Sequence, residues 1–342
     1  MTVYMGNETQ PALEIDYGDL WTRLGHILQP DRRCVVASSL DSVVSYLILS
    51  QALNWPMAGI YAPPALYLSA ERAYPPTATI DAEKTLEGQN PVFVGMNVCR
   101  EGIHSIGKDL LAWGPDTPLP PGLSAKSALN PNLLRAVTRR NAAEGFPFGL
   151  SYFVLCCMKH LGKLSHSEWP ASLAPMLIYL GRGMQKSLRN PHSTLQWSDW
   201  LHRDETLACR MPLASSFEGL NTFSMIQAGA GFNRDLQAFG VSPWNQSLSI
   251  RGPFGWSRLY DLFRWLEETT GMKGRFGGFF KRPRLIFAVD SRSSSASLRG
   301  YRVMSRSRPF TYRIVGSGSR GLKYDRFAAE TPANSAPPAL TE

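Results

Sequence analysis

The sequence predicts an α/β fold: an N-terminal parallel sheet with crossover helices, a mainly helical middle, and a small, basic, β-rich C-terminal module. Short apolar runs alternate with helix-like runs in the first 110 residues, which is typical of a parallel sheet with crossover helices. Apolar residues then recur at helical spacing, and basic residues concentrate near the C-terminus. We expect four parts: residues 1–150, 151–270, 271–327 (the basic segment) and a disordered tail at 328–342.

The N-terminal part carries the strand and helix patterns in order. Residues 33–37, 57–62 and 91–96 are short apolar runs that predict strands. Residues 41–53 form a longer apolar run, which predicts a mostly buried helix between the first two strands.

The middle and the basic segment follow a different pattern. Residues 151–161 and 171–185 are predicted helices, and residues 256–268 are amphipathic. Four strand candidates, separated by Ser, Gly and Arg, then predict a small sheet: residues 285–289, 301–304, 311–315 and 322–324. The glycine-rich residues 316–321 are predicted as a hairpin loop.

The composition narrows the class of protein. The chain has 342 residues, of which 44% are hydrophobic and 18% charged, so it can bury the cores of two ordinary domains. No apolar run approaches the roughly 20 residues of a membrane span, and the N-terminus lacks the pattern of a secretory signal. Five cysteines without repeated spacing indicate reduced thiols. We therefore expect a cytoplasmic protein with no membrane partner.

Adjacent cysteines near two histidines raise the question of zinc. Cys156 and Cys157 precede His160 and His166. Neighbouring residues on a helix point about 100° apart, and the surrounding side chains are apolar, so we expect buried free thiols.

The excess of basic residues is confined to the basic segment. It contains 14 basic and two acidic residues, a charge of +12, within a chain whose total is +9. Such a surplus favours a polyanionic partner, DNA or RNA. The expected nucleic-acid-binding residues are Lys273, Arg275, Lys281, Arg282, Arg284, Arg299, Arg302, Arg306, Arg308, Arg313 and Arg320.

Aromatic residues interleave with these cations. Phe276, Phe279 and Phe280, if exposed, could stack on bases. The alternative is that these rings are core residues and that the arginines form a solvated face or contact an acidic protein.

The turn after the first predicted strand lies where parallel sheets bind ligands. Asp41 and Ser42 could simply cap the helix that follows them. An ATP pyrophosphatase loop would resemble S-G-G-x-D-S, but Ser38 and Ser39 replace its two glycines, so a phosphate could not approach the backbone closely.

Three short motifs resemble another family. Ser39-Leu40-Asp41 is similar to a D-x-D motif whose first Asp is replaced, and residues 92–97 (V-F-V-G-M-N) are similar to V-x-V-D-x-D. Residues 105–109 (S-I-G-K-D) occupy the place of an Asp-His-His signature. In order and spacing, residues 34–111 resemble a degenerate DHH-family phosphoesterase.

The resemblance implies a phosphodiesterase fold that has lost its metals. Active members use two Mn²⁺ or Mg²⁺ ions, which need several carboxylates and imidazoles. This chain retains Asp41, the neutral Asn97, His104 and Asp109 as vestigial residues and places Lys108 where a ligand would lie. An ammonium group repels a cation. We therefore expect no catalytic residues, no metal and no cofactor.

The function expected from these patterns is a non-catalytic nucleic-acid-binding or assembly subunit of a larger complex. One alternative is an active nuclease or phosphodiesterase that uses Mn or Mg with Asp41 and Asp109. Another metal site could be built from Asp81, Glu83, Glu101 and His104. A third alternative is a scaffold that binds an acidic protein.

Overall fold

The structure is a computed structural model of the whole chain, and it describes fifteen stretches and single positions. They are residues 20–22, 25–70, 80–164, 176–177, 179–180, 193–194, 196–197, 201, 231–241, 246–248, 250, 255–281, 284–294, 297–314 and 322–327. The predicted tail, the loop at 316–321 and most of the predicted helix at 171–185 lie outside these residues.

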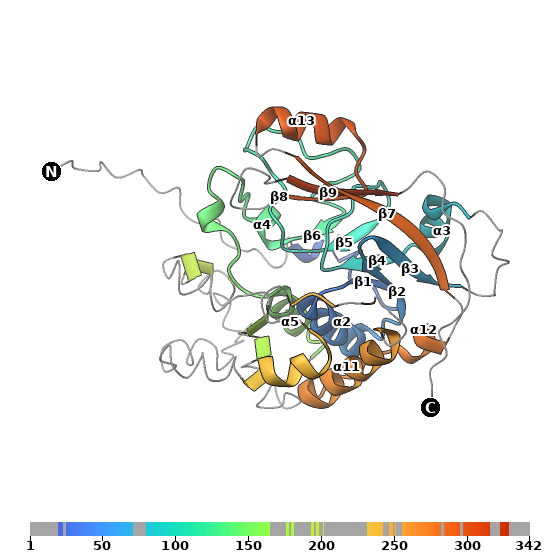
Figure 1. Cartoon of the computed structure of the whole chain (residues 1–342). Coiled ribbons are helices and arrows are strands. Elements are labelled where there is room, and N and C mark those ends of the chain that lie inside the picture. Colours follow the sequence, from blue (N-terminus) through green and yellow to red (C-terminus); the bar gives the residue numbers. More distant parts are fainter. Residues whose placement is uncertain are drawn as a thin grey trace.

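One nine-stranded sheet runs through the molecule in the order β6-β5-β4-β1-β2-β3-β7-β9-β8 (Figure 1). The strands are β1 (Cys34–Ala37), β2 (Met57–Ala62), β3 (Ala65–Ser69), β4 (Val92–Val94), β5 (His104–Ile106), β6 (Ala128–Leu129), β7 (Arg284–Ser294), β8 (Thr311–Ile314) and β9 (Leu322–Phe327). Strands β6 to β2 are parallel, and β3, β7, β9 and β8 continue the sheet in antiparallel pairs. The predicted α/β class is confirmed.

Helices complete the fold. They are α2 (Leu40–Leu53), α3 (Ala82–Gln89), α4 (Pro131–Leu134), the 3₁₀ helix η1 (Ala142–Glu144), α5 (Leu150–His160), α11 (Gly255–Thr270), α12 (Gly277–Lys281) and α13 (Leu298–Arg306). None of the helices in the described ranges is long and apolar enough to cross a membrane. The predictions of strands at 33–37, 57–62 and 91–96 and of helices at 41–53, 151–161 and 256–268 are confirmed.

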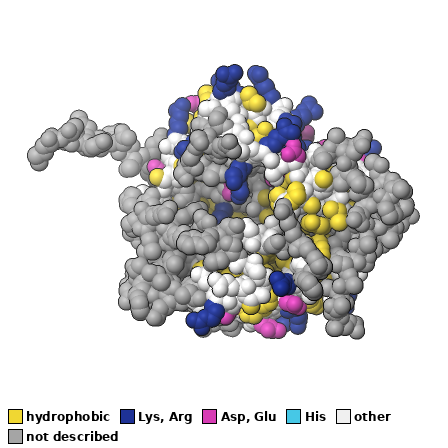
Figure 2. All heavy atoms as spheres, viewed as in Figure 1, with side chains coloured by type: hydrophobic (Ala, Val, Ile, Leu, Met, Phe, Trp, Pro, Cys, Tyr) yellow, Lys and Arg dark blue, Asp and Glu magenta, His cyan; other side chains and the backbone are white. Residues whose placement is uncertain are grey.

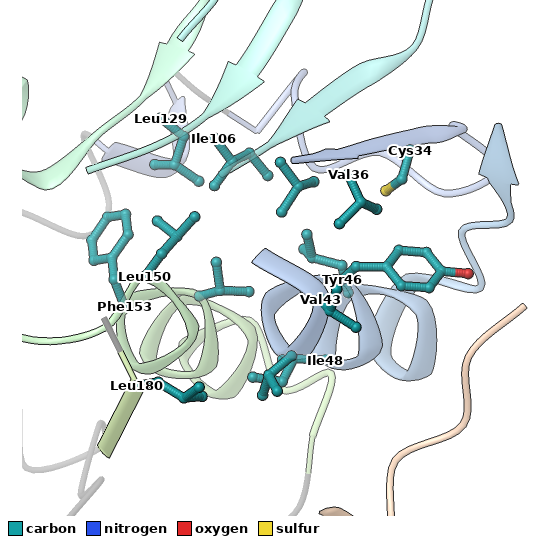
Figure 3. Packing of buried hydrophobic residues seen from close by; sticks show 14 of the residues in the cluster. Cys34, Val36, Val43, Tyr46, Ile48, Ile106, Leu129, Leu150, Phe153 and Leu180 are labelled. Carbon is teal, nitrogen blue, oxygen red and sulfur yellow. The ribbon is translucent and has the colours of Figure 1, made fainter. Parts of the chain in front are cut away.

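Alternating side chains of the parallel strands build two cores. Val36 and Ile106 point toward α2 and α5, where they meet Val43 and Leu150 (Figure 3). Val35, on the opposite face of β1, belongs to a second core that includes side chains from α3 and β7. Helix α2 lies between the sheet, α5 and α11, which explains why it is apolar on nearly every side.

The basic segment continues this sheet and does not form a small sheet of its own. Strand β7 pairs with β3 over its first half and with β9 over its second half. We call α13, β8 and β9 the C-terminal cap (residues 298–327). It folds back over the loops that follow β4 and β5, through bridges from Thr311 to Val98 and from Ile314 to Leu110. The cap therefore lies against the loops at the carboxyl ends of β4 and β5.

The prediction of a strand at residues 301–304 is wrong, since these residues lie in α13. The Ser297 hydroxyl accepts a hydrogen bond from the Gly300 amide and caps the helix. Tyr301 and Met304, three residues apart, are buried on one side, as helical periodicity requires. The short apolar pattern is compatible with both structures, and tertiary packing decides between them.

Candidate functional site

The carboxyl ends of the parallel strands hold a buried carboxylate, Asp41. Its Oδ2 accepts hydrogen bonds from Lys108 Nζ at 2.6 Å and from the Leu150 amide at 2.8 Å. Its Oδ1 accepts from the amide and hydroxyl of Ser151 at 3.0 and 2.8 Å. Both carboxylate oxygens are thus occupied by donors from the protein itself.

Asp41 caps α5 and does not cap its own helix. Leu150 and Ser151 open α5, and their amides have no partner within the helix. Helix α2 is capped instead by Ser39, whose Oγ accepts from the Ser42 amide at 3.2 Å. The expectation that Asp41 or Ser42 caps the helix following the first strand is therefore corrected: Asp41 joins the start of α2 to the start of α5.

Lys108 neutralises Asp41. It follows β5, and its ammonium also donates to the Phe148 carbonyl at 3.2 Å. Burial alone would raise the pKa of Asp41, but the Lys108 charge and the hydrogen bonds from Lys108, Ser151 and Leu150 outweigh it and lower the pKa below its usual value. The two residues form an ion pair in which Asp41 is buried and Lys108 is part-buried.

Three asparagines extend this arrangement. Asn130 Nδ2 donates to Asn97 Oδ1 at 3.2 Å and to the Asp109 carbonyl at 2.9 Å. Asn132 Nδ2 donates to the Lys108 carbonyl, and its Oδ1 accepts from the Phe146 amide. We call Asp41, Asn97, Lys108, Asn130 and Asn132 the polar cluster. Asn130 and Asn132 were not identified as site residues from the sequence, although Asn130 before Pro131 is a recognisable helix start.

Three glycines show that the polar cluster and the neighbouring start of α2 are closely packed against the backbone. A Cβ at Gly95, which has a φ of 91°, would lie 1.8 Å from Ser42 Oγ. A Cβ at Gly107 would lie 2.7 Å from Asn97 Nδ2, and one at Gly149 would lie 2.9 Å from Asp41 Oδ1. The family resemblance places acidic or imidazole ligands at positions 95 and 107, where this structure has no room for any side chain.

The four predicted vestigial residues are not all together. Asp41 and Asn97 belong to the polar cluster, and Asp109 touches it through its backbone carbonyl. His104 lies at the opposite, amino end of β5, beside His26, with ring centroids 5.0 Å apart. Burial, with the charges of Arg32 and His26, lowers the pKa of His104 to about 4.

The alternative acidic site is not assembled either. Asp81 caps α3, and Glu83 pairs with Arg100 at 2.6 Å. Glu101 is exposed in the loop between β4 and β5. Within the described ranges, no group of three or more His, Cys, Asp or Glu side chains is placed to hold a metal ion.

The donor set of the polar cluster does not fit a pair of divalent ions. It offers one carboxylate, which already accepts four hydrogen bonds, together with neutral amides and an ammonium group. Two divalent ions need several anionic oxygens to balance their charge. We therefore derive no reaction step through a metal.

The cysteines near His160 are part of the core. Cys156 and Cys157 are buried on α5, and neither is part of a disulfide. His166 lies outside the described residues, so the structure does not address its part in the zinc alternative.

The predicted nucleic-acid-binding residues separate into groups at two ends of the molecule. Lys273 and Arg275 lie by the end of α2, where the Lys273 amide donates to Gln51 and the Arg275 guanidinium to the Asn54 carbonyl. Lys281 ends the nearby α12. Helix α13 lies at the opposite end, next to β8 and β9 (Figure 1). The side chains of Arg282, Arg284 and Arg320 lie outside the described residues.

Helix α13 exposes a row of three arginines. Arg299, Arg302 and Arg306 are exposed, while Tyr301 and Met304 pack toward the sheet. The spacing of three and four residues places the arginines on one side of the helix, which we call the arginine face. Figure 2 shows Lys and Arg side chains gathered at this end of the molecule.

Two further cations lie on the last two strands of the sheet, β9 and the edge strand β8. Arg313 of β8 is directly opposite Lys323 of β9, and both are exposed. Their neighbours Tyr312 and Tyr324 are buried, so these two cations point to the side of the sheet away from those rings. Arg308, also exposed, follows α13.

The aromatic rings of the basic segment are core residues. Phe276 and Phe280 are buried against Tyr260 and Phe263 of α11, and Phe279 is buried beside Phe280. The idea that these three phenylalanines stack on bases is therefore wrong, because the amphipathic face of α11 takes them up.

Comparisons with protein-family models, curated protein sequences and solved structures found no match to this chain. The DHH-like interpretation of residues 34–111 thus rests on the sequence motifs and stays a prediction.

Proposed function

We propose that this chain is a non-catalytic nucleic-acid-binding or assembly subunit of a larger complex, with a degenerate phosphoesterase-like N-terminal part. Its partners would be DNA or RNA and other protein subunits. A reducing compartment such as the cytoplasm suits it, because the described cysteines are buried and outside disulfides.

The polar cluster supports the part of the proposal that says the chain does not hydrolyse phosphodiester bonds. Lys108 lies 2.6 Å from the one carboxylate of that cluster, and α5 supplies the remaining donors. A cation entering there would have to displace an ammonium group and break three other hydrogen bonds. The proposal therefore assigns the carboxyl ends of the strands a structural role.

The proposal that the chain binds nucleic acid rests on one observation, the exposure of the cations of the basic segment. Ten of their described side chains are exposed: Lys273, Arg275, Lys281, Arg292, Arg299, Arg302, Arg306, Arg308, Arg313 and Lys323. Among the described residues, Arg292 with Asp290 is the ion pair that this group forms. The other nine are available to phosphates, which would release counterions and favour binding.

The experiment is a salt series with fluorescent oligonucleotides, followed by anisotropy. We expect the logarithm of the association constant to fall linearly with the logarithm of salt concentration, by about 0.9 for each phosphate contacted in duplex DNA. The proposal fails if no oligonucleotide binds at low salt.

Two other outcomes would support the alternatives. Manganese-dependent shortening of the oligonucleotide that disappears in Asp41→Ala would establish a nuclease. Weak oligonucleotide binding that does not change when Arg299, Arg302 and Arg313 are reversed in charge would favour a scaffold for an acidic protein.

A further inference from the structure

We infer that the arginine face of α13 docks in the major groove of double-stranded DNA. This inference rests on the proposed function and narrows it to one surface and one class of nucleic acid. It is carried by the exposure of the three arginines, the absence of acids on α13, and the burial of the aromatic rings of the basic segment.

Helix α13 is a firmly supported, protruding element. Its nine residues span about 13.5 Å. Tyr301 and Met304 are buried beneath it, and the Tyr301 hydroxyl donates to the Pro118 carbonyl in a loop after β5. The opposite side of the helix, with Arg299, Arg302 and Arg306, is exposed.

The arginine face has an unbalanced charge. Arg302 and Arg306 are four residues apart, a spacing at which like charges repel each other on a helix. Helix α13 contains no acidic residue, and none of its arginines forms an ion pair with another described residue. A polyanion would relieve this repulsion, so charge complementarity identifies the class of partner.

The aromatic rings favour duplex over single strand. Binding of single strands depends on exposed aromatic side chains that stack on unpaired bases. In the described part of the basic segment Phe327 is the aromatic residue that is not fully buried, and it packs on Phe310 with ring centroids 4.3 Å apart. Without exposed rings for stacking in its described part, the basic segment would recognise nucleic acid through contacts with phosphates and with a groove of the duplex.

The widths of the major grooves favour DNA over RNA. The major groove of B-form DNA is about 12 Å wide and admits an α-helix, whereas that of A-form RNA is too narrow for side chains to read. Val303 lies among the arginines with 58% of its surface exposed. An apolar side chain at this position could contact a thymine methyl group, while arginines bind phosphates or guanine.

The test compares two triple variants with the same change in charge. Arg299→Gln, Arg302→Gln and Arg306→Gln together remove the arginine face. Lys84→Gln, Arg234→Gln and Arg258→Gln together remove three exposed cations that lie outside the basic segment. Circular dichroism checks that both variants fold, and the single variant Val303→Glu places a negative charge on the same face as an independent probe.

The probes are a DNA duplex of about 20 base pairs, its single strand, and an RNA duplex of the same sequence. We expect the wild-type protein to prefer the DNA duplex. Loss of the arginine face should weaken that binding about tenfold or more and reduce the salt slope by about 3. The matched control should stay within about twofold of wild type, and Val303→Glu should weaken binding.

Three results would overturn this inference. Equal weakening by both triple variants would mean diffuse charge attraction. Preference for single-stranded DNA or for duplex RNA would remove the groove-docking argument and leave nucleic-acid binding intact. Absence of binding to all three probes would overturn the proposed function as well.

Discussion

At the scale of single residues, the polar cluster depends on the pairing of Lys108 with Asp41. An unpaired buried charge costs far more than an exposed one, because burial removes its hydration. Asp41 is 5% exposed, and its ion pair with Lys108 joins the loop after β5 to α2. The sequence predicts that both residues follow strands. It does not predict the ion pair between them, because their positions depend on where α5 begins.

Replacing Lys108 should therefore destabilise the protein markedly. We expect Lys108→Met to lower the free energy of unfolding by about 3 kcal/mol, since Asp41 keeps its hydrogen bonds from α5 but loses its counter-charge. Urea denaturation at neutral pH measures the loss. The exposed Lys84→Met is the matched control and should change stability by no more than about 0.5 kcal/mol. A similar loss in both variants would contradict the importance of the ion pair.

The same variant should respond to pH in a defined direction. In the wild-type protein the pKa of Asp41 is lowered on folding, so its stabilising contribution is full above the unfolded-state pKa and is lost as the pH falls through the folded value. Without Lys108, burial raises that pKa, and protonation relieves the unpaired charge. The stability difference between wild type and Lys108→Met should shrink from about pH 7 to about pH 4. A constant difference would contradict this account.

His104 offers a second pH-dependent test. Burial, with the positive charges of Arg32 and His26, lowers the pKa of His104 to about 4. Because the unfolded state binds this proton more readily, the stability contribution is present above the ordinary histidine pKa and falls as the pH drops toward the folded value. An NMR titration of the His104 ring should give a midpoint near 4, whereas a midpoint near the ordinary value of about 6.5 would contradict the described burial.

At the scale of elements, close approaches between turns and helices determine the packing. The turn after β4 meets the start of α2 where Gly95 lies against Ser42. The sequence predicted both elements from their apolar runs. It could not predict their contact, since a glycine after a strand is compatible with many turns.

Two glycine variants distinguish the stability cost of steric overlap from the cost of backbone strain. Gly95 and Gly102 both have positive φ, at 91° and 77°. A Cβ at Gly95 would overlap Ser42, whereas a Cβ at Gly102 would meet no atom within 4 Å. We expect Gly95→Ala to cost about 1–3 kcal/mol more than Gly102→Ala in thermal or urea unfolding. Equal costs would show that the turn after β4 is not packed against α2 as described.

Helix α13 shows where pattern reasoning reaches its limit. Its nine residues contain only a few apolar positions, and a strand and a helix are equally compatible with them. The long amphipathic run of α11 left no such ambiguity, and its helix was predicted correctly. The assignment of α13 was decided by the Ser297 cap and by burial of Tyr301 against Tyr312, which brings distant parts of the chain together.

At the scale of the whole molecule, the nine-stranded sheet unites both ends of the chain. Strand β7 pairs with β3, and Leu285 and Phe287 share a core with Leu66 and Phe93. The composition predicts a domain boundary at residue 271, where the local net charge becomes strongly positive. The structure has no boundary in the sheet there, because hydrogen-bond pairing and core packing do not follow surface charge.

This continuity predicts a single cooperative unit. Native-state hydrogen exchange should give amides of β1 and β7 the same free energy of opening, within about 1 kcal/mol, since each strand opens only when the shared core opens. A chain ending at Thr270 should not fold, because it would expose Leu66 and Phe93 without their partners. Early exchange of β7 and β9 while β1 remains protected would contradict one shared core.

The central claim is that an ion pair, and not a pair of metal ions, occupies the carboxyl ends of the parallel strands. Anomalous diffraction from crystals soaked in manganese tests it most directly, since the scattering locates bound Mn²⁺ at atomic positions. The account predicts no anomalous peak beside Asp41 and an ammonium group of Lys108 in contact with its carboxylate. Two peaks about 4 Å apart next to Asp41, with Lys108 turned away, would contradict it.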